Sequence, residues 1–156
     1  MSEPKKIDRV DAVEVLFPVE GPYTAETVVA AAGAIAWLWR YLAHATLNSA
    51  SDALGGPADV YLAIGSLTSA SRSAEQVLGQ LVRWAVRLAR TPGLTHDEYK
   101  ADDPEARDAA VTAAVLAEYY LHNAGTSTSF VARDLDKVSA ALGHLYIASA
   151  DGGDEE

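Results

Sequence analysis

The chain has 156 residues, of which 49% are hydrophobic and 22% charged, and it carries a formal net charge of −10. This length suits one domain with a single core, and the composition is that of a folded globular protein. The acidic balance disfavours non-specific attraction to DNA or to anionic lipid. Because the sequence contains no cysteine, it excludes a disulfide framework and a thiolate zinc site.

Residues 1–22 are expected to form an N-terminal extension. The opening MSEPKKIDRVDAVEV lacks an apolar stretch of the kind found in secretory signals, so we expect a cytoplasmic protein. The alternation at Val13, Val15 and Phe17 indicates a short strand-like segment. The Pro and Gly residues of 18–22 then interrupt regular structure.

A helix is predicted from about residue 25 to residue 48. Its apolar run, residues 28–39, is short for a membrane span, which needs about 20 such residues, and Arg40 and His44 follow it. We therefore expect no membrane association. One face of this helix repeats apolar residues every three or four positions, as in a coiled coil. Trp37 and Tyr41 project from a second face, so the helix needs cover on two sides.

Three further helices are predicted, over residues 58–90, 104–123 and 127–150. The first has the strongest periodic signal in the chain, with an apolar seam at Val60, Ile64, Leu67, Ser71, Ala74, Leu78, Leu81, Ala85 and Leu88. The second begins at the capping residue Asp103 and is expected to end at Gly125. The seams of the last two helices are expected at Ala106, Ala110, Ala113, Ala117 and Tyr120, and at Val131, Leu135, Val138, Leu142 and Leu145.

These patterns predict an all-α fold, an antiparallel up-down-up-down four-helix bundle over residues 23–150. Residues 151–156 are expected to be a disordered acidic tail. The long second helix, 58–90, should extend past its shorter neighbours. Leu81, Trp84 and Leu88 would lie on that overhang, where either residues 10–18 or a second chain must cover them.

The sequence offers little catalytic chemistry. Phosphate-binding loops, dinucleotide fingerprints and the HExxH zinc motif are absent. Glu118 and His122 are four residues apart and His44 could share their end of the bundle, but no second ligand pair exists. We therefore expect no catalytic residue, no metal and no cofactor.

The apolar surface in excess of one small core predicts a non-enzymatic helical interaction or assembly module that acts as a homo-oligomer, most simply a homodimer. Another protein as partner stays open. The predicted interface consists of Trp37, Tyr41, Leu81, Trp84 and Leu88. One alternative is a bundle that binds a small apolar ligand in a cavity under its Trp and Tyr residues. A less favoured one is a nucleic-acid-associated regulator that uses Arg83, Arg87 and Arg90.

Overall fold

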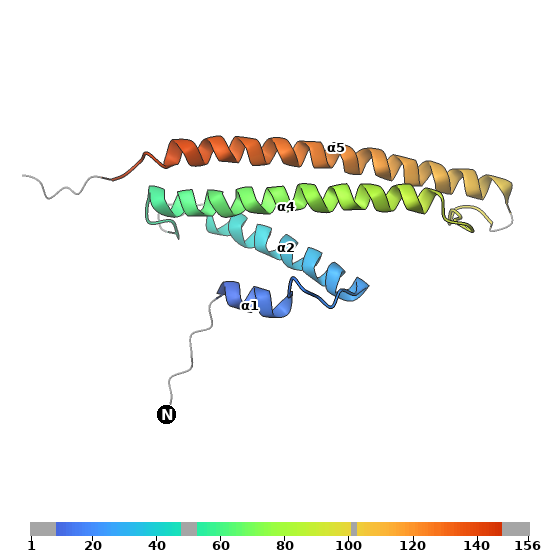
Figure 1. The fold of residues 1–156 in the computed structure, drawn as a ribbon, viewed down its shortest axis with the longest axis horizontal. Coiled ribbons are helices and arrows are strands. Elements are labelled where there is room, and N and C mark those ends of the chain that lie inside the picture. Colours follow the sequence, from blue (N-terminus) through green and yellow to red (C-terminus); the bar gives the residue numbers. More distant parts are fainter. Residues whose placement is uncertain (1–8, 48–52, 101–102, 148–156) are drawn as a thin grey trace, which may run out of the picture. The chain divides into compact units, whose positions relative to one another are not determined.

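The computed structural model describes residues 9–47, 53–100 and 103–147 (Figure 1). These residues form four helices, α1 (Arg9–Leu16), α2 (Ala25–Ala45), α4 (Pro57–Ala89) and α5 (Pro104–Leu142), and no strand. The predicted all-α class is confirmed, although the four described helices are not the four that the sequence placed. The chain divides into two compact units, residues 1–53 and 54–156. The expected acidic tail, 151–156, lies outside the described residues.

The strand-like segment expected before residue 18 is wrong, because residues 9–16 form helix α1. Its backbone bonding continues one residue further, where the Phe17 amide donates to the Val13 carbonyl at 2.9 Å. Asp11 in the first turn suits the positive end of a helix dipole. The alternation of apolar residues that suggested a strand covers too few positions to outweigh these local helical preferences.

Helix α2 begins at a capping box. The Thr24 hydroxyl accepts a hydrogen bond from the Thr27 amide at 3.1 Å, and the Thr27 hydroxyl accepts one from the Thr24 amide at 3.0 Å. This arrangement satisfies two amides that the first helical turn leaves unbonded. The helix then runs for 21 residues, and none of them is buried.

By length and composition, α2 could cross a membrane. The most apolar window of Ala25–Ala45 has a mean hydropathy of 1.2, and no part of that window is buried. The core helix of a soluble protein passes the same test of length and composition. The sequence-based expectation of no membrane association therefore stays a prediction.

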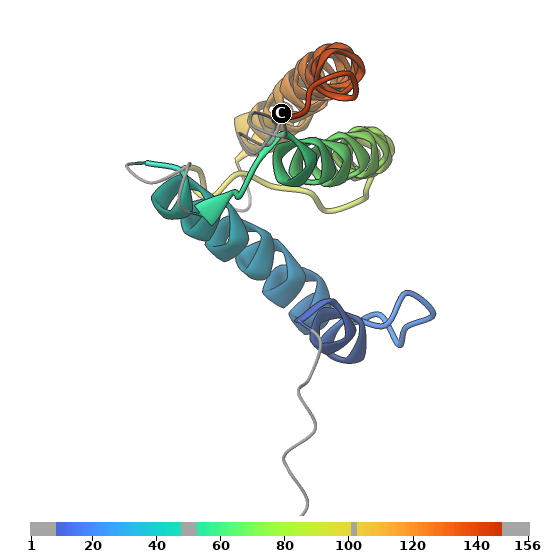
Figure 2. The same ribbon diagram turned by 90° about the vertical axis from the view of Figure 1, so that its left-hand side faces the viewer.

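The second unit is an antiparallel pair of long helices, α4 and α5, which lie side by side in both views (Figures 1 and 2). The predicted long second helix is confirmed as α4, with 33 residues. It starts at Pro57, where proline suits the first helical position. At its other end, the Arg107 guanidinium donates to the Thr91 carbonyl at 2.5 Å and to the Ala89 carbonyl at 3.4 Å. The start of α5 is thereby fixed against the end of α4.

The predicted break at Gly125 is wrong, since residues 104–142 form one helix of 39 residues. Three hydroxyls next to Gly125 bond to carbonyls one turn earlier: Thr126 to His122 at 3.2 Å, Ser127 to Asn123 at 3.0 Å and Thr128 to Ala124 at 2.8 Å. Serine and threonine hydroxyls can bond to the backbone of a turn and so compete with helix formation. In α5 they bond to carbonyls of the helix itself. Within 23–147, the described residues thus contain the three helices α2, α4 and α5, where the sequence predicted four.

The continuous α5 also removes the predicted overhang of α4. Because α5 is the longer helix, it extends along the whole of α4 (Figure 1). The exposure of Leu81 and Trp84 therefore needs another explanation, which comes from the face of α4 on which they lie.

Small residues form the contact between α4 and α5. The buried residues of the pair are Thr68, Ser71, Ala85, Ala106, Ala110, Ala114 and Ala132, and no large side chain among the described residues is fully buried. A Cβ added to Gly125 would lie 3.7 Å from the Cβ of Leu78, so the two backbones approach closely there. We call the contact line the seam; it comprises Ile64, Thr68, Ser71, Leu78, Val82, Ala85, Ala110, Ala114, Leu121, Gly125, Thr128, Ala132, Leu135, Ser139 and Leu142.

Candidate interaction surface

A second line of apolar residues runs along α4 beside the seam. Its positions are separated alternately by four and three residues, the spacing of a coiled-coil contact. Val77, Leu81 and Trp84 on this line are 52%, 41% and 51% exposed. We call it the α4 stripe: Ala63, Leu67, Ala70, Ala74, Val77, Leu81, Trp84 and Leu88.

The α4 stripe contains three of the five residues that the sequence assigned to an interface. Leu81 and Trp84 are exposed, and Leu88 is half-buried. They do not lie on an overhang, as the sequence predicted. They are exposed because the stripe lies on a side of α4 that α5 does not cover.

Helix α5 carries a similar line, the α5 stripe: Ala113, Ala117, Tyr120, Ala124, Ser127, Val131, Asp134 and Val138. Tyr120, Val131 and Val138 are 65%, 51% and 41% exposed. The sequence placed Val131 and Val138 on the same buried line as Leu135 and Leu142. This is wrong: only the two leucines lie in the seam and are half-buried.

The two stripes lie on one side of the helix pair. Most stripe residues precede a seam residue by one position, as Leu81 precedes Val82 and Ala113 precedes Ala114, which is a rotation of about 100° about the helix axis. The other three, Ala74, Leu88 and Ala117, continue the same spacing. In antiparallel helices the same rotation from the contact line points toward the same side. The α4 and α5 stripes together therefore form one surface two helices wide, which we call the apolar face.

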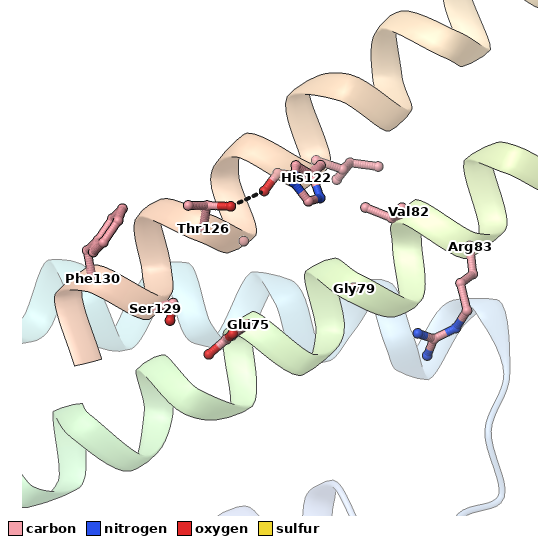
Figure 3. A pocket seen from close by; sticks show the side chains of 10 residues that line it. Glu75, Gly79, Val82, Arg83, His122, Thr126, Ser129 and Phe130 are labelled. Atoms are coloured by element: carbon pink, nitrogen blue, oxygen red, sulfur yellow. Dashed lines mark hydrogen bonds between the residues drawn. The ribbon is translucent and has the colours of Figure 1, made fainter. Parts of the chain in front are cut away.

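The opposite side of the pair supports this geometry. Residues that follow the seam by one position come from both helices and line a single pocket of about 420 Å³ (Figure 3). They include Gly79 and Arg83 of α4 and His122, Thr126 and Ser129 of α5. Since residues one position after the seam share a side, those one position before it share the other.

The pocket has a mixed lining of polar and apolar residues. Glu75, Arg83, His122 and two hydroxyl residues line it, and Phe130 is its one aromatic ring apart from the imidazole (Figure 3). It has no Trp or Tyr in its lining, whereas the predicted ligand cavity was expected under such residues. The two glycines of the lining, Gly79 and Gly125, leave the space that forms the hollow.

The other two predicted interface residues belong to the first unit. Trp37 is 69% exposed and Tyr41 is 60% exposed, both on α2. The Arg40 guanidinium carbon lies 5.9 Å from the centre of the Trp37 ring, which is within range of a cation–π contact.

The described residues contain no group of three or more His, Asp and Glu that could hold a metal ion. Glu118 is half-buried and His122 is exposed one turn later, while His44 belongs to the other unit. Arg83, Arg87 and Arg90 are all exposed near the end of α4, a position where cations suit the helix dipole.

One carboxylate on the apolar face is held in its charged form. A hydrogen bond of 2.8 Å from Lys137, together with its positive charge, lowers the pKa of Asp134, and Arg133 contributes further. The charge lies on α5 between Val131 and Val138, so it divides the α5 stripe into two apolar segments.

No known protein family matches the chain, and neither a curated protein nor a solved structure resembles it significantly.

Proposed function

We propose that the protein is a non-enzymatic helical assembly module that acts as a homo-oligomer, most simply a homodimer. The observation that supports this proposal is the apolar face of the α4–α5 pair. It presents Val77, Leu81 and Trp84 to solvent at heptad spacing, with no covering element in the second unit.

The energetic reason is the small core of this unit. Alanine, serine and threonine supply its buried residues, whereas the large apolar side chains are half-buried or exposed. Burial of apolar surface stabilises by roughly 25 cal/mol per Å², so a pair of helices that buries mainly methyl groups gains little by itself. Exposed apolar surface of this extent is typical of an interface.

The exposed aromatic residues of α2, Trp37 and Tyr41, are a second candidate contact within the same function. Aromatic residues dominate the energetics of many interfaces, and Trp and Tyr are the commonest anchors. The pocket around His122 gives less support to an apolar ligand, because Glu75 and Arg83 line it and no Trp or Tyr does. The net charge of −10 gives less support to nucleic acid.

Light scattering coupled to size-exclusion chromatography tests the proposal. We expect a mass of at least twice 16.5 kDa at micromolar concentration. A mass of 16.5 kDa that does not change with concentration would contradict homo-oligomerisation. A stable monomer that co-purifies with a small apolar molecule would instead favour the ligand-binding alternative.

A further inference from the structure

We infer that the apolar face binds the same face of a second copy of the chain, so that two α4–α5 pairs complete one antiparallel four-helix bundle. This inference rests on the proposed homo-oligomeric function and specifies which surface carries it. Trp84 and Leu81 of each copy are its main anchors.

The spacing of the stripes supports a helical partner. Residues 63–88 of α4 repeat at intervals of four and three, which places them along one line of a straight helix pair. The adjoining seam has the same spacing one position later, so α4 has two neighbouring contact lines. A helix with two such lines packs against one neighbouring helix along each line, as in a four-helix bundle.

The distribution of side-chain size supports a second copy as the partner. Along α4 most of the larger residues, from Val77 to Leu88, lie in the C-terminal half, whereas the N-terminal half has three alanines and one leucine, Leu67. The α5 stripe has no such division, because Tyr120 lies in its first half and Ser127 and Asp134 lie in its second.

The larger half of the α4 stripe therefore lies toward one end of the apolar face. A half-turn about an axis that lies in the plane of the face and perpendicular to the helices places the larger half of α4 over the smaller half of the partner's α4. The face is self-complementary in this sense, as a twofold-symmetric interface requires.

The size of the face also fits a dimer. From residue 63 to residue 88 the stripe is about 38 Å long at 1.5 Å per residue, and two helices are roughly 20 Å wide. The product is about 760 Å² per copy, close to the 800 Å² per partner of a standard stable interface.

The test uses pairs of variants in the full chain, compared by sedimentation equilibrium, with circular dichroism to verify that helicity is kept. Trp84→Ala should raise the dimer dissociation constant about 30-fold or more, because a large aromatic anchor is lost. Phe130→Ala is its control: Phe130 is as exposed as Trp84, 51%, but lines the pocket on the opposite side. It should change the constant by about twofold or less.

A second pair guards against an indirect effect of removing a large residue. Ala117→Glu introduces a charge at a small residue of the α5 stripe and should yield a helical monomer. Ala140→Glu is the same change on the other side of α5, one position after the seam residue Ser139, and should leave the dimer intact. Glutamate is a good helix former, so neither change should unfold the exposed position.

A wild-type dimer that only the two apolar-face variants dissociate would support the inference. If the wild-type chain is a dimer and both apolar-face variants keep its dissociation constant, the inference is overturned. Homo-oligomerisation would still be supported, and α2 would be the next surface to test. A wild-type monomer would overturn both the inference and the proposed function.

Discussion

At the scale of single residues, two glycines show how the same residue type has opposite roles. Gly93, in the loop after α4, has a φ of +75°, a left-handed conformation that other residues rarely adopt. Gly125 lies inside α5 and in the seam, and its φ is not positive. The first glycine is required by its backbone, whereas the second only allows close contact with Leu78.

This difference predicts opposite effects of alanine. Gly125→Ala should raise the free energy of unfolding by about 0.5–1 kcal/mol, because alanine favours helix and its Cβ would lie at an ordinary 3.7 Å from Leu78. Gly93→Ala should lower that free energy by about 1 kcal/mol, since its backbone would be strained. Urea denaturation measures both. Destabilisation by Gly125→Ala would indicate a helix end at that residue instead of a continuous α5.

At the scale of elements, the seam determines how α4 and α5 fit together. Leu78 and Leu135 are the larger side chains near its middle, and both are half-buried. The salt bridge between Arg72 and Asp136, at 2.7 Å, joins the same helices but is solvent-exposed. Exposed ion pairs stabilise by about 0–1 kcal/mol, so the leucines contribute more to the packing.

Leu78→Ala and Leu135→Ala should therefore each lower the free energy of unfolding by about 2 kcal/mol, since each leaves a space in the seam. Arg87→Ala, an exposed change near the end of α4, should cost under about 0.5 kcal/mol. Thermal or urea melts at one protein concentration give the ranking. If Arg87→Ala were the most damaging of the three, the seam would be misplaced.

At the scale of the whole molecule, a small core in the second unit and a large apolar face outside it predict that folding is coupled to association. The melting temperature of the wild-type chain should then rise by a few degrees with each tenfold increase in protein concentration, because mass action favours the oligomer. Calorimetry over a hundredfold range measures this. The Ala117→Glu variant should melt at one temperature throughout the range, and a wild-type chain that behaves in the same way would argue for a monomer.

The sequence by itself determined the helical class and the limits of α2 and α4, because these depend on local signals. Thr24 caps one helix, Pro57 starts another, and the three-four spacing of apolar residues identifies both as amphipathic. Leu81, Trp84 and Leu88 also stood out as candidate contacts, although the sequence placed them on an overhang that the longer α5 removes.

Only the tertiary structure decided three other features. The residues 125–129, GTSTS, are compatible with a turn or with a helix. In the structure they are helical: Gly125 packs against Leu78, and hydroxyls of this segment bond to carbonyls one turn earlier. Short alternation at Val13 and Val15 was equally ambiguous, and the structure resolves it as α1. Finally, α4 has two adjacent apolar lines, each with heptad spacing. Spacing alone does not tell which line faces α5, because that depends on how closely the small residues of the two helices approach each other.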